Sequence, residues 1–133
     1  MTRRARLIAE VLFERARVGW YLRHTAFDTS IERLAVATAR ARASCDEIDE
    51  VVWCTGWMLH NRESTRTTCL QRAMVRFVML RRRGLPVCFK VGIEPDSVPL
   101  QGHAWLELEG RPVFETEPLR CAVTFSFPCD VPS

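Results

Sequence analysis

Lysine is almost absent from this chain of 133 residues: Lys90 is the only one, and arginine supplies the other fixed cations. The chain also has little excess charge of either sign, because its formal net charge at pH 7 is only +3. A nucleic-acid-binding domain usually carries a much stronger basic footprint, so the composition argues against that class of protein. The mild positive charge would suit a substrate or partner that carries some acidic residues.

Long apolar runs are also missing. No window approaches the roughly 18 consecutive apolar residues that indicate a membrane-spanning helix. The run from Leu7 to Phe13 is short and contains Glu10, so it does not read as a secretory signal. Hydrophobic residues make up 47% of the chain, as in ordinary soluble proteins. We expect one cytoplasmic domain over residues 1–133, with a helical part at 1–60 and a catalytic core at 65–127.

The six cysteines are an even number, but they are widely spaced and several lie inside apolar runs. Without a secretory signal, free and mostly buried thiols in a reducing compartment are the better interpretation. Cys54 and His60 lack the remaining ligands of a metal site, and Cys121 and Cys129 have no partners at zinc spacing. We therefore expect neither a metal nor another cofactor.

Apolar residues at helical spacing predict four helices, at about residues 3–24, 28–43, 44–59 and 69–83. The side chains expected to cap the second helix are Asp28, Thr29 or Ser30. Those expected to cap the third are Ser44 or Asp46. The front of the chain is therefore predicted to be helical.

The chain changes character after Gly84. Strands are predicted at 87–93, 103–109 and 111–116, with a short further strand around 123–127. In the second of these, His103, Trp105 and Glu107 should point to one face of the sheet. The whole chain is thus predicted to be α+β, with N-terminal helices followed by a small antiparallel sheet.

Two stretches carry the chemistry. Cys69 is placed where a helix should begin, so unpaired N–H groups and the helix dipole favour its thiolate. His103 begins a predicted strand, and an imidazole can take the thiol proton and later give it to a leaving amine. This pattern is typical of a cysteine hydrolase or acyltransferase.

The choice of a third, orienting carboxylate depends on the turn of the predicted hairpin. A two-residue loop would place Glu115 opposite Ala104, with its side chain on the wrong face. A three-residue loop, with Gly110 in the left-handed conformation, would place Glu115 directly opposite His103. We expect the three-residue loop and therefore Glu115, with Glu117 as the alternative if the register shifts by two residues.

These residues resemble the leader peptidases of lasso peptide biosynthesis, small enzymes with a transglutaminase-like, papain-related core. The resemblance is best over residues 65–117 and looser in the helical N-terminus. It rests on four segments: Cys69-Leu70-Gln71-Arg72-Ala73, residues 80–86, residues 91–93 and residues 103–113.

The resemblance implies that Cys69 is the nucleophile, His103 the general base and acid, and Glu115 the third member of the triad. The family commonly has aspartate at the last position, and glutamate is longer by one methylene. The implied substrate is a ribosomally made precursor peptide, cut between leader and core, often near a threonine at the leader's second-last position. The implied partners are a separate small leader-recognition protein and, downstream, an ATP-dependent lasso cyclase.

Two further residues are candidates for substrate or oxyanion contacts. Gln101 could donate a hydrogen bond to an oxyanion from a loop, although the backbone N–H of Cys69 needs no side chain to do so. Trp105 is expected to be a wall of the cleft or part of the core. Two alternative functions stay open: a transglutaminase, deamidase or peptide ligase on the same fold, and a non-catalytic adaptor that binds a partner through the N-terminal helices.

Overall fold

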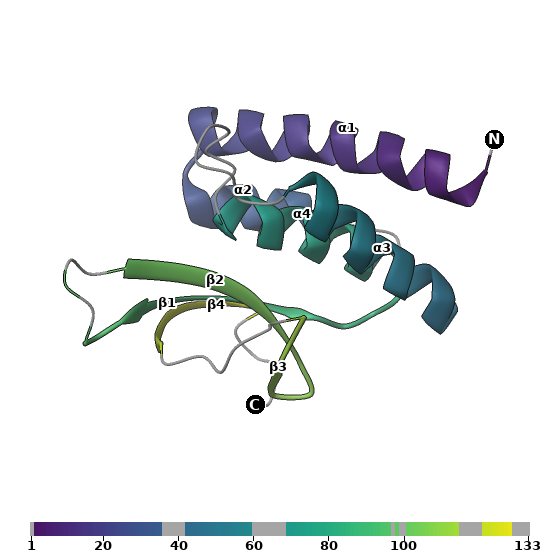
Figure 1. Cartoon of the computed structure of the whole chain (residues 1–133). Helices are drawn as coiled ribbons and strands as arrows, with labels where there is room; N and C mark the ends of the chain where they lie inside the picture. The colour runs from purple at the N-terminus through teal and green to yellow at the C-terminus, as the bar shows by residue number, and fades with distance from the viewer. Residues whose placement is uncertain are drawn as a thin grey trace.

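The computed structural model describes residues 2–35, 42–59, 69–96, 98, 101–114 and 121–128, with the backbone alone for Gln101. Within these ranges four helices cover one face of a four-stranded antiparallel sheet (Figure 1). The elements are α1 (Arg3–His24), α2 (Phe27–Leu34), α3 (Cys45–Met58), α4 (Cys69–Arg82), β1 (Cys88–Glu94), β2 (Gln101–Leu108), β3 (Arg111–Val113) and β4 (Ala122–Phe127). None of the described helices has both the length and the apolarity to cross a membrane.

Side-chain caps begin α1 and α3 where the sequence predicts these helices to start. The hydroxyl of Thr2 accepts a hydrogen bond from the backbone N–H of Ala5 at 3.2 Å, which caps α1. The hydroxyl of Ser44 accepts one from Glu47, also at 3.2 Å, which caps α3. Each cap satisfies a backbone donor that the first turn of a helix leaves unpaired.

The prediction for the second helix is wrong at its start. The helix α2 begins at Phe27, and its N-cap is Ala26, which makes no side-chain capping bond. Ser30, one of the expected caps, is buried inside the helix, where its hydroxyl donates to the carbonyl of Ala26 at 3.0 Å. This hydroxyl bonds backward along the chain, as serine often does in a helix, and is not available as a cap. Residues 36–41, over which this helix was expected to continue, lie outside the described ranges.

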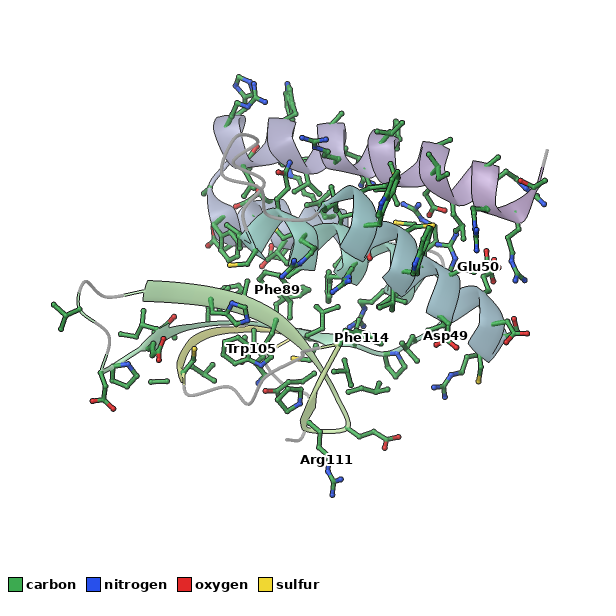
Figure 2. The ribbon with its side chains drawn as sticks, in the orientation of Figure 1. Asp49, Glu50, Phe89, Trp105, Arg111 and Phe114 are labelled. Atoms are coloured by element: carbon green, nitrogen blue, oxygen red, sulfur yellow. The ribbon has the colours of Figure 1, made fainter. Side chains whose placement is uncertain are left out.

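The sheet order is β3-β2-β1-β4, so β1 and β2 are its central strands. Phe89 of β1 and Leu106 of β2 lie opposite one another and face the helices, where Phe89 packs against Phe77 of α4. In Figure 2, Phe89 lies between the sheet and the helices, whereas Trp105 lies on the other side of the sheet. The helix α4 is the most buried of the four and contacts both central strands, so the core lies between α4 and β1–β2.

Ion pairs join α1 to the last turn of α4. Glu14, which is fully buried, is bonded by Arg82 at 2.8 Å and by Arg17 at 3.1 Å. Glu10 accepts bonds from Arg82 and Arg83. A buried charge needs such partners, because without them the free-energy cost of removing it from water would not be compensated.

The turn between β2 and β3 differs from the expected three-residue loop. Leu108 pairs with Arg111, so the loop has only two residues, Glu109 and Gly110. Their φ angles are 54° and 79°, and positive values at both central positions are those of a type I′ turn. This turn follows the right-handed twist of the strands, which explains why a glycine at its second position does not require a bulge.

Candidate active site

Cys69 is the first residue of α4, as the sequence predicts, and its side chain is partly buried. A side chain at this position lies beside backbone N–H groups that have no partner within the helix. These N–H groups and the positive end of the helix dipole both stabilise a negative charge on the sulfur. The local structure therefore favours the thiolate form of Cys69.

His103 of β2 meets Cys69 across the boundary between helix and sheet. Its imidazole hydrogen-bonds to the sulfur of Cys69 and so lowers the pKa of the thiol below its ordinary value, against the burial that raises it. The backbone N–H of Ala104 and the positive charge of Arg72 lower this pKa further. The structure thus brings together the two residues that the sequence pairs as nucleophile and base.

Other cysteines show what burial alone does to a thiol. Burial raises the pKa of Cys54 on α3 and of Cys88 on β1. Cys54 is fully buried and Cys88 nearly so, and the five cysteines within the described ranges are all free thiols. The pKa of the Cys69 thiol therefore differs from those of Cys54 and Cys88 because of the groups that surround it.

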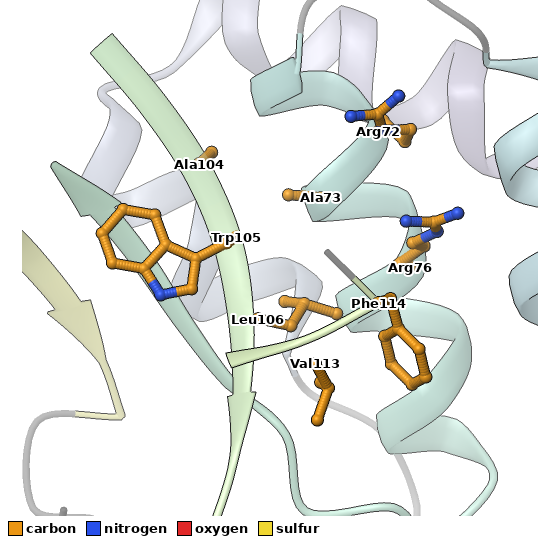
Figure 3. A pocket seen from close by; sticks show the side chains of 8 residues that line it. All are labelled: Arg72, Ala73, Arg76, Ala104, Trp105, Leu106, Val113 and Phe114. Atoms are coloured by element: carbon orange, nitrogen blue, oxygen red, sulfur yellow. The ribbon is translucent and has the colours of Figure 1, made fainter. Parts of the chain in front are cut away.

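Small side chains allow the close approach of α4 and β2. Ala73 and Ala104 face one another across this contact and are both nearly buried (Figure 3). Ala73 lies one helical turn after Cys69, and Ala104 directly follows His103. Larger side chains at these two positions would separate the elements that carry the thiol and the imidazole.

A small pocket continues this contact toward β3. The side chains that line it come from α4, β2 and the end of β3: Arg72, Ala73, Arg76, Ala104, Trp105, Leu106, Val113 and Phe114 (Figure 3). Its free space is about 10 Å³, the size of a single water site. The guanidinium of Arg76 is already engaged, since it donates to the hydroxyl of Thr55 at 2.7 Å.

Gln101 and Trp105, the two candidates for substrate or oxyanion contacts, are described to different extents in the structure. Gln101 is the first residue of β2, opposite Glu94, and is therefore not the loop residue that was expected. Its side chain lies outside the described part of the structure, so its oxyanion role stays a prediction. Trp105 is only 3% exposed, and its ring lies parallel to that of His103 within 15°, with the ring centroids 6.0 Å apart.

The third carboxylate is not settled by the pairing of the strands. The described ladder ends with Leu106 opposite Val113, and Phe114 then takes a φ of 63°. A left-handed residue interrupts the alternation of faces, so the register cannot be extended from β3 to Glu115. Glu115 and Glu117 both lie outside the described residues, and the preference for Glu115 stands on the resemblance alone.

Two polar contacts around Trp105 were not predicted from the sequence. Glu107 accepts a hydrogen bond from the indole of Trp105 at 3.0 Å, and Lys90 lies 4.0 Å from the other oxygen of this carboxylate. The alternation of β2 already places Trp105 and Glu107 on the face of His103. No signal in the sequence places Lys90 there, because its position depends on the register between β1 and β2.

Comparison with known proteins gives one match. The family model of the transglutaminase-like superfamily matches residues 11–125, which include most of the helical N-terminus as well as the sheet. No curated protein and no solved structure matches the chain.

Proposed function

The chain belongs to the transglutaminase-like superfamily, and within it we propose that the protein is a cysteine peptidase that removes the leader from a lasso precursor peptide. The superfamily and the α+β fold are compatible with a cysteine peptidase or an acyltransferase. The observation that carries the proposal is the hydrogen bond between His103 and Cys69, with the lowered pKa of the thiol. The choice of substrate rests on the sequence resemblance over residues 65–117.

In the proposed reaction the thiolate of Cys69 adds to the scissile carbonyl carbon, and a tetrahedral oxyanion forms. The backbone N–H of Cys69, at the start of α4, is a donor for this oxyanion. The imidazolium of His103 then gives its proton to the leaving amine of the core peptide, which leaves the leader as a thioester on the enzyme.

Water completes the proposed cycle. His103 takes a proton from water as it attacks the thioester, and the leader departs with a new carboxylate while the thiol is restored. Glu115 is proposed to hold the imidazole in the required tautomer. The released core peptide carries a free amine, the group that an ATP-dependent cyclase would use. A separate recognition protein is proposed to deliver the leader, because a second linked contact raises the effective concentration of a weakly bound substrate.

An acyltransferase or deamidase is the second candidate, because the superfamily is compatible with an acyltransferase as well as with a peptidase. The acyl-enzyme would be the same, and only the acceptor of the acyl group would differ. The adaptor alternative has less support. A cysteine that only packs in the core would resemble Cys54 and Cys88, whose pKa values are raised by burial.

The test is mass spectrometry of a candidate precursor incubated with the recognition partner and either the wild-type protein or Cys69→Ala. Cys45→Ala is the matched control, because Cys45 is an exposed cysteine at the start of α3. One cut at the leader–core junction by the wild type and the control, absent in Cys69→Ala, is the expected result. A mass change without cleavage would identify a deamidase or transferase, and binding without any mass change would identify an adaptor.

A further inference from the structure

The face of β2 that carries His103 also carries Trp105 and Glu107. The rings of His103 and Trp105 lie parallel within 15°, and their centroids are 6.0 Å apart. This separation lies within the usual range for offset-stacked rings. The indole is 3% exposed, so its position is set by the protein around it.

Polar contacts hold the indole in place across three strands. Its Nε1–H donates to Oε2 of Glu107 at 3.0 Å. Lys90, directly opposite Trp105 on β1, lies 4.0 Å from Oε1 of the same carboxylate and donates to Ser126 of β4 at 2.7 Å. Because the side chains of Lys90 and Glu107 are each only 14% exposed, water screens these contacts weakly.

Gly92 makes the room that the indole occupies. It lies opposite His103 on β1, and a Cβ atom there would be 2.9 Å from the Cη2 atom of Trp105. The same Cβ would be 2.5 Å from the backbone oxygen of Ala122. Any other residue at position 92 would therefore displace either the ring or the neighbouring strand.

We propose that Trp105 is a positioning residue that orients the imidazole of His103 toward Cys69, held in turn by Glu107, Lys90 and Ser126. We call these four residues the Trp105 brace. A parallel ring at this distance restricts rotation of the imidazole about its side-chain bonds. The π face of the indole also attracts the imidazolium that forms when Cys69 loses its proton. This inference rests on the proposed catalytic role of His103.

Plain core packing makes a different prediction for Trp105. If the indole only fills space, its loss should lower stability and leave the thiol as reactive as before. If the indole orients His103, its loss should slow the alkylation of Cys69 by more than the loss of stability explains. An aromatic replacement should then restore part of the alkylation rate. Glu107 should matter only while the indole N–H is present.

The experiment measures the alkylation rate of Cys69 by iodoacetamide at neutral pH, followed by peptide mass mapping, together with the midpoint of thermal unfolding. We expect Trp105→Leu to slow the alkylation of Cys69 by about two- to fivefold, which corresponds to the free energy of a cation–π contact. Trp105→Phe should recover most of this loss. Val18→Ala is the control, since Val18 is fully buried in α1 and lies outside the brace. It should lower the unfolding midpoint and leave the alkylation rate unchanged.

A double-mutant cycle keeps the proposal testable if Trp105→Leu does not fold. Glu107→Gln should slow Cys69 in the wild-type background and have no further effect in Trp105→Phe, which lacks the indole N–H. An equal effect of Glu107→Gln in both backgrounds, or a wild-type rate in a folded Trp105→Leu, would overturn the brace.

Failure of the proposed function gives a separate result. If His103→Ala leaves the alkylation rate of Cys69 unchanged, the pair itself is absent and the catalytic proposal fails. If His103→Ala slows Cys69 while the brace variants do not, only the positioning role of Trp105 is lost. The precursor assay adds a further readout, in which brace variants should lower kcat and leave KM near the wild-type value.

Discussion

The imidazole of His103, on β2, hydrogen-bonds to the sulfur of Cys69, the first residue of α4. In the sequence these residues are separated by a helix, a strand and the segments around them. The contact depends on the packing of α4 against the central strands, where Ala73 faces Ala104. It supplies a thiol and a proton acceptor in one place, which is the minimum that nucleophilic catalysis by cysteine needs.

Cys69 should react faster than Cys54 and Cys88 at mildly acidic pH. Its lowered pKa keeps the thiolate populated until the pH falls through that value, whereas the raised pKa values of Cys54 and Cys88 keep them protonated. At about pH 6 we expect Cys69 to be alkylated at least about tenfold faster than either. Mass mapping after timed alkylation measures this, and equal rates would contradict it.

His103→Ala should raise the pKa of Cys69 toward its ordinary value and reduce precursor cleavage by about 10²–10⁴-fold. The fold should persist, because His103 is only partly buried at the start of β2. Circular dichroism and the cleavage rate are measured together. His24→Ala, at an exposed position in α1, is the matched control and should cleave like the wild type. Cleavage near the wild-type rate in His103→Ala would rule out the proposed pair.

Glu115→Gln should impair cleavage strongly and leave the unfolding midpoint near the wild-type value, because the amide no longer provides the charge that stabilises the imidazolium. Glu109→Gln is the control, since Glu109 is exposed in the turn. If Glu117→Gln is damaging and Glu115→Gln is not, Glu117 is the third member of the triad. Wild-type cleavage in both variants would show that neither carboxylate acts on His103.

The turn at Glu109 offers a direct test of the corrected hairpin. Glutamate is sterically disfavoured at a φ of 54°, and asparagine adopts this conformation more readily. Glu109→Asn should therefore stabilise the protein by about 0.5–1 kcal/mol. Urea unfolding measures the change. A loss of stability would contradict a two-residue turn with positive φ at both positions.

Glu10 should make stability depend on pH. Burial alone would raise the pKa of this carboxyl, but its bonds and charge pairing with Arg83 and Arg82 outweigh burial and lower the pKa. The resulting stabilisation is present above the unfolded-state pKa and is lost as the pH falls through the lowered value.

Glu10→Gln should accordingly cost about 1–3 kcal/mol at pH 7, and the difference from the wild type should shrink in acid. Urea unfolding at neutral and at acidic pH measures this difference. Glu32→Gln, at an exposed position of α2, should have little effect at either pH. A difference between Glu10→Gln and the wild type that stays constant with pH would contradict the assigned ion pairs.

Much of the fold could be predicted from local patterns. The bounds of α1, the capping of α3 by Ser44 and the start of α4 at Cys69 follow from periodicity and from side chains that satisfy the first helical turn. The strands follow from alternation and from the turn residues between them. These signals are confined to a few neighbouring residues and do not need the tertiary structure.

The parts that could not be predicted depend on contacts between distant segments. The hairpin was assigned one residue too many because Gly110 suits both kinds of loop, and the twist of the paired strands decides between them. Ser30 was one of three residues expected to cap the second helix, but it lies in the core and its hydroxyl donates to preceding carbonyls. Lys90 reaches Glu107 only through the register of β1 and β2.

The central claim is that Cys69 cleaves a peptide bond with water as the acyl acceptor. The most direct measurement is mass spectrometry of a precursor digested in water labelled with heavy oxygen, with wild-type protein beside Cys69→Ala and with the recognition partner present in both. We predict one cut in the wild-type sample, a single heavy oxygen at the new carboxylate of the leader, and no cut with Cys69→Ala. Cleavage by Cys69→Ala at the wild-type rate, or a leader joined to another amine in place of water, would contradict the account.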